Sequence, residues 1–231
     1  MPIEQLVAAY LETTLLALVA TGLLIRGRIG LCWSFFAYLL LMLTIHWLLM
    51  LCTEQFWTLS FYIGKETALF VVKVAIAVEI WQRTFWSFPR ARIRVGLLLV
   101  AALLATAAAG VTVPSRLDLY DVFIGIVNPR RQAGALALYV IVVSTASWYR
   151  VPLHPLHRAI LVGFAGCLIV HTLVGSFIGW HHGSTWALRL SLVLLVTAYS
   201  ATLLWWARAA WRQSQAPGAI VARLQPWARS W

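Results

Sequence analysis

The sequence has few charged residues: Asp, Glu, Lys and Arg together make up 11% of its 231 residues. A water-soluble domain usually carries about 25% charged residues and about 45 to 50% apolar ones. Here 62% of the residues are hydrophobic and the mean hydropathy is +0.84. This composition excludes an ordinary water-soluble globular protein and predicts a protein embedded in a membrane.

Cysteine is also scarce, with three in the whole chain. Cys32 and Cys52 lie at opposite ends of one apolar run, about 30 Å apart if that run is a helix. Cys167 lies in the middle of another run. We therefore expect no disulfide framework.

Apolar runs of about 20 residues recur along the chain, and each is long enough to cross ~30 Å of hydrocarbon as a helix. The runs lack the apolar–polar alternation of membrane β-strands. The predicted fold class is all-α: a polytopic membrane protein with a bundle of seven transmembrane helices in residues 1–212, followed by a cytoplasmic tail, 213–231, that contains Arg and Trp. The predicted spans are 5–25, 31–51, 61–81, 93–113, 134–148, 160–178 and 186–206.

The basic residues gather in alternate connections between these spans. One set of connections has no acidic residue and contains Arg26, Arg28, Arg83, Arg90, Arg92, Arg94, Arg150, Arg158, Arg208, Arg212, Arg223 and Arg229. The other set, with the N-terminus, mixes a few basic residues with Glu and Asp. Because translocation of Lys and Arg is disfavoured, this pattern predicts a cytoplasmic C-terminus and, with seven spans, an outside N-terminus. The predicted location is the cytoplasmic (inner) membrane of a bacterium.

The net charge of +11 could indicate nucleic-acid binding, but the cations are spread over several short segments instead of one patch. We therefore expect no nucleic acid as a partner. The expected partners are the anionic lipid headgroups on the cytoplasmic side and a further membrane protein.

Ionisable side chains inside the predicted spans are the candidates for function, because placing them in hydrocarbon is costly. At about 1.5 Å per residue, five of them lie ~5 to 10 Å below the outer surface and one, Lys73, lies ~18 Å deep. Glu66 and Lys73 are seven residues apart and so share one face of the third span. We predict a polar layer near the outer face. Its candidate members are Glu12, His46, Glu66, Lys73, His171 and Arg189.

This layer has more than one interpretation. A hydrogen-bonded network could satisfy Glu12, Glu66 and Arg189 as ion pairs while the histidines stay neutral. A metal site could use His46, Glu66 and His171 as ligands with an open position for water, although the chain has no His-x-x-x-His motif. A haem between the two histidines is disfavoured, because both lie close to the same surface. The sequence assigns no cofactor.

Two stretches resemble a known family. The first is the run 61–66 (FYIGKE), followed by 75–80 with Glu79, then Phe85, Pro89 and a basic restart at 90–96; the second is 150–163. Both are similar to a family of small uncharacterised seven-span inner-membrane proteins of bacteria such as acidobacteria. The resemblance covers about a third of the chain, implies the same seven-span architecture and implies no reaction.

Three functions remain open at this stage. The leading hypothesis is a non-enzymatic integral membrane module, either a sensor or an accessory subunit of a larger membrane complex. The second is an intramembrane metal-dependent hydrolase, loosely comparable in span number to the ceramidase and adiponectin-receptor class, whose His-x-x-x-His motif this chain lacks. The third is a small proton-coupled transporter with Glu66 and Lys73 as a coupled site.

Overall fold

The structure is a computed structural model that describes residues 3–56, 58–111, 123–180 and 185–212. This part of the chain is all helical, without strands. The long helices are α1 (Ile3–Ile25), α2 (Trp33–Leu51), α4 (Leu59–Phe85), α5 (Pro89–Val111), α7 (Asn128–Trp148), α8 (Pro155–Trp180) and α9 (Thr185–Trp211). Short helical turns are η1 (Ile29–Leu31), α3 (Thr53–Phe56) and η2 (Phe123–Val127). The predicted tail, 213–231, lies outside the described residues.

Five of the long helices, α1, α2, α5, α8 and α9, are long and apolar enough to cross a membrane. The all-α prediction is confirmed for the described residues, and the five apolar helices suggest a membrane-embedded protein. The other two, α4 and α7, are as long but carry charged residues. The predicted fifth span began at residue 134, whereas α7 begins at Asn128, with Pro129 in its first turn and Arg130 and Arg131 inside it. Proline is well suited to a first helical turn, where its missing N–H has no helical partner.

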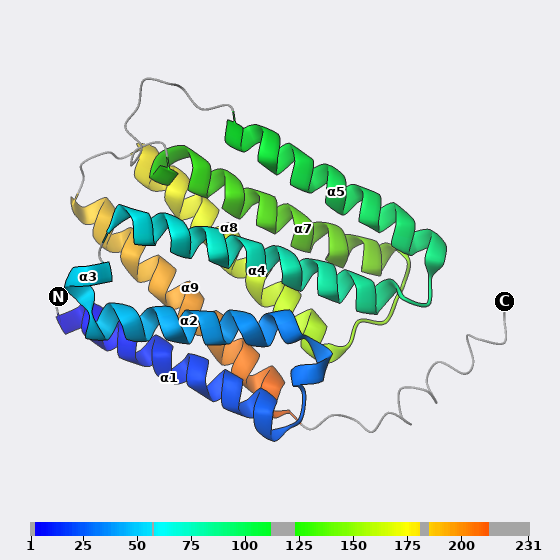
Figure 1. Cartoon of the computed structure of the whole chain (residues 1–231), viewed down its shortest axis with the longest axis horizontal. Coiled ribbons are helices and arrows are strands. Elements are labelled where there is room, and N and C mark those ends of the chain that lie inside the picture. The colour runs from blue at the N-terminus through cyan, green and yellow to red at the C-terminus, as the bar shows by residue number, and fades with distance from the viewer. Residues whose placement is uncertain (1–2, 57, 112–122, 181–184, 213–231) are drawn as a thin grey trace.

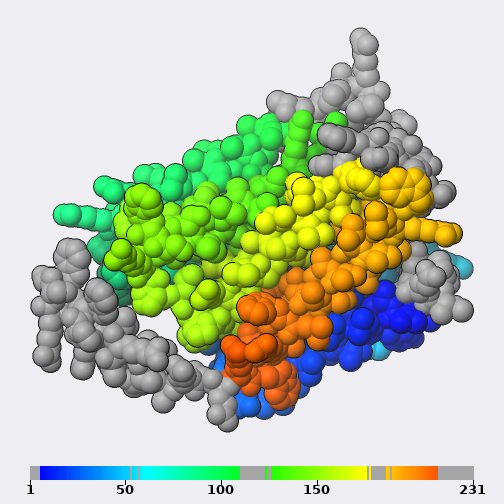
Figure 2. All heavy atoms as spheres, turned by 180° about the vertical axis from the view of Figure 1, so that it is seen from behind, coloured from blue at the N-terminus to red at the C-terminus, as the bar shows by residue number. Residues whose placement is uncertain are grey.

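The long helices run alternately in opposite directions (Figure 1). The α1–α2, α4–α5 and α7–α8 connections lie at one end of the bundle, where α9 also ends, and the chain begins at the other. Among the described helices, α1, α2, α4, α7, α8 and α9 form a closed ring in that order, and α9 packs against α1. Helix α5 lies outside the ring, against α7 and α4. Figure 2 shows α8 and α9 side by side on the opposite face.

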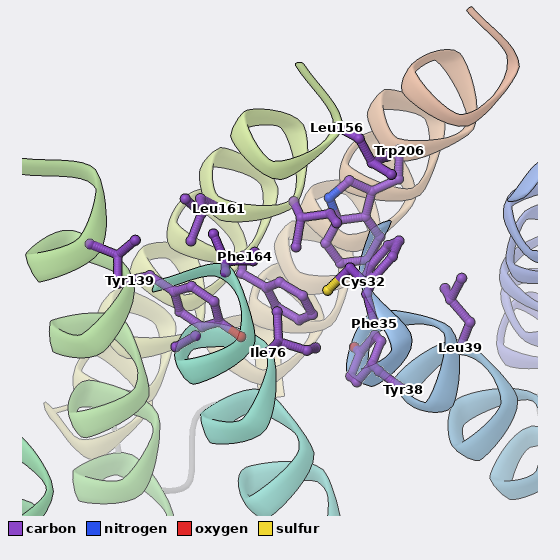
Figure 3. Packing of buried hydrophobic residues seen from close by; sticks show 14 of the residues in the cluster. Cys32, Phe35, Tyr38, Leu39, Ile76, Tyr139, Leu156, Leu161, Phe164 and Trp206 are labelled. Carbon is purple, nitrogen blue, oxygen red and sulfur yellow. The ribbon is translucent and has the colours of Figure 1, made fainter. Parts of the chain in front are cut away.

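Aromatic rings fill the centre of this ring of helices (Figure 3). Phe164 of α8 lies 4.7 Å from the Trp206 ring, 5.0 Å from Tyr38 and 5.1 Å from Tyr139, measured between ring centroids. Phe35 lies 5.0 Å from Trp206 in an edge-to-face arrangement. Such geometries add stabilisation beyond the buried area. We call these five residues the aromatic cluster.

Two rings of the aromatic cluster bond to the backbone of neighbouring helices through their polar ends. The Trp206 indole N–H donates to the carbonyl of Ala159 at 3.1 Å, and the Tyr139 hydroxyl donates to the carbonyl of Lys73 at 2.9 Å. A side chain at Gly163 would place its Cβ 2.3 Å from the Trp206 indole nitrogen. The missing side chain therefore lets α8 and α9 approach closely, as small residues do at membrane helix interfaces.

The α1–α2 connection is joined to the end of α9 by Arg28, a charged residue of the connection itself. Gly27, two residues after the end of α1, has a φ of +61°, and the Arg28 N–H donates back to the Leu23 carbonyl. This is the glycine-terminated helix end that satisfies free carbonyls. The Arg28 guanidinium donates to the carbonyls of Ala209 and Arg212 at the end of α9. A cation is favoured there because the C-terminus of a helix is partly negative.

Glu79 of α4 caps the start of α2. Its carboxylate accepts from the N–H groups of Trp33 at 3.0 Å and Ser34 at 2.8 Å, which have no partner inside the helix. Glu79 also forms an ion pair with Arg83 one turn further along α4, with Nε–Oε1 at 2.9 Å. Arg83 also donates to the Gly30 carbonyl at 2.7 Å. The pair is therefore more than a surface contact, because it joins α4 to the α1–α2 connection.

Candidate functional site

Helices α4 and α7 run in the same direction, and a chain of polar side chains connects them. The Lys73 ammonium donates to Oε1 of Gln132 at 2.9 Å, and Nε2 of Gln132 donates to Glu66 Oε2 at 3.4 Å. The same Gln132 amide also bonds to Oδ1 of Asn128 at 3.3 Å, and Asn128 donates to the Tyr62 hydroxyl at 3.2 Å. We call these five residues the α4–α7 polar chain.

The helical repeat explains this alignment. Tyr62, Glu66 and Lys73 are separated by four and seven residues and therefore lie on one face of α4, and Asn128 and Gln132 are one turn apart on α7. The sequence had predicted that Glu66 and Lys73 share a face. In the structure both bond to the Gln132 amide, Lys73 through its oxygen and Glu66 through its nitrogen.

Lys73 is the most deeply placed member of the polar chain. It is 9% exposed, and its side chain lies ~21 Å along α4 from the first residue of that helix. In the described part of the chain, its ammonium has no carboxylate within ion-pair distance, and its hydrogen bond goes to the neutral Gln132 amide. Glu66 forms its ion pair with Lys65 instead, at 3.1 Å. Gln132 is therefore the link between a buried cation and a carboxylate.

A second polar centre joins α1 and α2. His46 Nε2 lies 3.8 Å from Glu12 Oε2, and the other ring nitrogen, Nδ1, lies 3.2 Å from the Thr13 hydroxyl. Thr13 donates to the Ala9 carbonyl, so it accepts from the imidazole. This fixes the tautomer with a proton on Nδ1 whenever the ring is neutral. We call Glu12, Thr13 and His46 the α1–α2 pair site.

The α1–α2 pair site opens into a pocket of about 350 Å³. Its walls are mostly apolar and come from α1, α2 and α9, including Leu49, Met50, Leu192 and Val196. The Glu12 and His46 side chains are 15% and 14% exposed and form the polar part of the lining. A mostly apolar cleft with a few convergent polar groups is typical of a small-molecule site.

Direct hydrogen bonds and ion pairs group four members of the predicted layer into two pairs, Glu12 with His46 and Glu66 with Lys73 through Gln132. In the described residues, no hydrogen bond or ion pair connects Glu12 or His46 with Glu66 or Lys73. The helices that carry the two centres are neighbours in the ring, but α2 contributes its polar group toward α1 and α4 contributes its own toward α7. The rotation of each helix about its own axis decides which neighbouring helix its polar side chain faces. Depth along the helix, which the sequence gives, does not reveal this rotation.

Two predicted members belong to neither centre. His171 on α8 and Arg189 on α9 have exposed side chains and make no hydrogen bond or ion pair with a described residue. The predicted network had Arg189 as the partner of the carboxylates. In the described residues the two carboxylates have other neighbours: Glu12 lies beside His46, and Glu66 pairs with Lys65.

The hypothetical metal ligands are not gathered. Within residues 3–56, 58–111, 123–180 and 185–212, no group of three or more His, Cys, Asp or Glu side chains lies close enough to hold a metal ion. His46 is directed to Glu12 and Glu66 to Gln132, so the set of His46, Glu66 and His171 is not assembled. The described geometry offers no support to the metal-dependent hydrolase.

Several residues of the two centres were missed in the sequence. Gln132, Asn128 and Thr13 are neutral, whereas the cost of charge in hydrocarbon selects only ionisable residues as candidates. Asn128 and Gln132 also precede the predicted fifth span, since Arg130 and Arg131 delayed its start. Their four-residue spacing, together with the spacing of Glu66 and Tyr62, is the signal that could have found them.

Two histidines near the α7–α8 connection, His154 and His157, form a third polar group. His157 Nε2 lies 2.9 Å from the Leu31 carbonyl, and its ring is 5.5 Å from that of His154. Burial, followed by the charges of His157 and Arg28, lowers the pKa of His154 to about 4. His154 is therefore neutral near pH 7 and supports the packing of the α7–α8 connection.

The fold and the polar centres define a class: an all-helical bundle whose apolar helices are suited to a membrane, with hydrogen-bonded polar side chains inside. No family model matches the chain, and comparisons with curated proteins and with solved structures find no match either. The resemblance to small seven-span inner-membrane proteins therefore stays a prediction.

Proposed function

We propose that this chain is a non-enzymatic integral membrane module, a sensor or accessory subunit of a larger complex in the cytoplasmic membrane of a bacterium. In this proposal all seven long helices cross the membrane. The N-terminus is outside, and the C-terminus lies in the cytoplasm.

One observation carries the proposal: the aromatic cluster occupies the centre of the ring of helices. Phe35, Tyr139 and Trp206 are at most 1% exposed, and they come from three different helices. A transport pathway through a helix bundle has to pass along its axis between the helices. Close-packed rings at this position favour a module that packs rigidly over one that conducts a solute.

The α4–α7 polar chain supports the insertion of the two less apolar helices. Lys73, Gln132 and Glu66 bond to one another between α4 and α7, away from lipid. Charged residues in membranes typically face the bundle interior and pair in this way. A helix that is too polar to cross alone can therefore be accommodated once it packs against its neighbours.

The distribution of basic residues supports the orientation. Arg28, Arg83, Arg92 and Arg212 lie at the end of the bundle where α9 ends, near the α1–α2 and α4–α5 connections (Figure 1). Cations on this end and a mixed charge on the other correspond to the positive-inside pattern.

The test is to isolate the chain from native membranes in mild detergent and determine its mass by native mass spectrometry. We expect a stoichiometric complex with another membrane protein, which chemical crosslinking in intact membranes should reproduce. A monomer that holds a stoichiometric, exchangeable metal ion would overturn the proposal in favour of the hydrolase.

A second candidate, a small proton-coupled transporter, is favoured by one specific observation. Gln132 connects the ionisable groups Glu66 and Lys73 on one face of α4. In proteoliposomes with an imposed pH gradient, this candidate requires a proton flux that Glu66→Gln abolishes. Glu54→Gln is the matched control, because Glu54 is exposed on α3. A flux that both variants leave unchanged would remove the transporter hypothesis.

A further inference from the structure

A groove of about 600 Å³ lies between α4 and α5, at the end where the short turn 86–88 connects them. Its lining along α5 follows one helix face from Pro89 to Leu103 and includes Ile93, Leu97 and Val100, which are exposed. Helix α5 stands outside the ring of helices, so this groove opens to the surroundings of the bundle. Apart from one cation, its lining is apolar.

The cation in the lining is Arg92, which two tryptophans hold in place. Its guanidinium carbon lies 4.8 Å from the Trp86 ring centroid and 6.0 Å from the Trp81 ring centroid. Stacking on aromatic faces restrains the guanidinium plane, while its N–H groups point outward in that plane. A planar fork of donors held in this way suits a phosphate, which it can bind through two parallel hydrogen bonds.

No described carboxylate neutralises the charge of this region. In the described part of the chain, Arg90, Arg92 and Arg94 form no ion pair with a carboxylate. Arg83, nearby on α4, is already paired with Glu79. The mouth of the groove therefore has a positive potential, and the rest of the groove is apolar.

We infer that the α4–α5 groove binds one anionic phospholipid, with its phosphate at Arg92 and an acyl chain along α5 toward Leu103. The inference rests on the proposed membrane location, in which this end of the bundle faces the cytoplasm. Basic pockets between membrane helices on that side are suited to anionic headgroups. Tryptophans at the same level are suited to the interface between headgroups and hydrocarbon.

The dimensions of the groove fit one lipid leaflet. From Arg92, the proposed phosphate site, to Leu103 the helix rises ~17 Å, close to the ~15 Å of half a ~30 Å hydrocarbon core. Gly96 lies in the middle of this face, where a Cβ would approach the Trp81 ring to 2.7 Å. The absence of a side chain there keeps the floor of the groove close to α4 and leaves room for the chain above it.

The test measures lipid binding to the purified, delipidated full-length chain by native mass spectrometry. The probes are phosphatidylglycerol and phosphatidylcholine with the same acyl chains. We expect phosphatidylglycerol to bind more tightly than phosphatidylcholine, and Arg92→Gln to weaken phosphatidylglycerol binding about 10-fold, since a hydrogen bond to a charged group contributes on the order of 1.5 to 3 kcal/mol. Arg158→Gln is the matched control, because Arg158 is exposed on α8 and does not line the groove.

Further variants separate the headgroup contact from the acyl-chain contact. Arg92→Lys keeps the charge without the planar fork, so its affinity is expected between those of wild type and Arg92→Gln. Val100→Trp fills the groove from an exposed position and should weaken binding without removing a cation. Circular dichroism spectra of each variant confirm that it is folded.

Three results would overturn the inference: equal affinity for the two lipids, the same loss in Arg158→Gln as in Arg92→Gln, or displacement of the lipid by an equal concentration of inorganic phosphate. Because the isolated chain is tested, the absence of a partner protein does not affect the outcome. The inference and the proposed function can therefore fail independently.

Discussion

At the scale of single residues, Gln132 has the most demanding position in the bundle. Its amide accepts from Lys73 and donates to Glu66 and Asn128, and it is 8% exposed. A buried ammonium without a partner would cost far more than a neutral side chain. Since an amide offers both an acceptor and donors, one residue can serve the cation and the carboxylate together.

This position leads to a stability prediction. Gln132→Leu should lower the free energy of unfolding by about 1 to 3 kcal/mol, because it removes the acceptor for Lys73 and a donor to Glu66. Gln132→Glu should retain most of the stability, since a carboxylate can still accept from Lys73. The measurement is reversible unfolding in dodecyl maltoside with increasing fractions of dodecyl sulfate. A Leu variant as stable as wild type would show that the polar chain contributes nothing.

The sequence predicted part of the polar centres at this scale. Glu66 and Lys73 share a face because both follow the helical repeat of one segment, and that could be read directly. The contact of Glu12 with His46 joins two helices, and its residues are 34 positions apart in the numbering, so it depends on how α1 and α2 rotate against each other. The orientation of α8 and α9 likewise decides that His171 and Arg189 are exposed.

At the scale of elements, close helix packing depends on where side chains are missing. Gly163 on α8 faces the Trp206 ring of α9, and Gly134 on α7 faces Thr106 of α5. Gly166, also on α8, has nothing within 4 Å of the position its Cβ would take. Two glycines of one helix, three residues apart, thus have different surroundings.

These two glycines form a matched pair for mutation. Gly163→Ala should destabilise the bundle by about 1 to 3 kcal/mol, because the new methyl group meets the indole of a buried tryptophan. Gly166→Ala should be neutral or stabilising by up to about 1 kcal/mol, since alanine favours the helix and no atom obstructs it. Unfolding in mixed detergent micelles measures both changes. Equal effects of the two substitutions would contradict the packing at the α8–α9 interface.

The elements themselves were predicted with one systematic difference. The segments rich in Leu, Ala and Val become the helices with the highest hydropathy, since only helices satisfy every backbone group within one segment in hydrocarbon. Several helices begin further toward the N-terminus than the predicted spans: α4 at Leu59, α5 at Pro89, α7 at Asn128 and α8 at Pro155. The first turn of α4 is stabilised by the Thr58 cap and that of α7 by Pro129, which hydropathy does not register.

At the scale of the whole molecule, the alternating direction of the helices predicts on which side of the membrane each connection lies. In a cysteine-free background, Gln55→Cys, in the α2–α4 connection, should react with a membrane-impermeant maleimide added to intact cells. Ser87→Cys, in the α4–α5 turn, should react only after the membrane is permeabilised. Both native residues are exposed, so burial does not protect either. Labelling of the two from the same side would exclude the proposed seven spans.

The sequence alone determined the membrane class and the all-helical fold of the described residues, because the free energy of placing a segment in hydrocarbon depends on that segment's own composition. It also determined which end of the bundle is basic, since charge is a property of each connection. Only the tertiary structure decided which polar side chains meet, how the aromatic rings fill the centre and where α5 leaves a groove. These features depend on the rotation and spacing of neighbouring helices, and those result from side-chain packing between segments far apart in the chain.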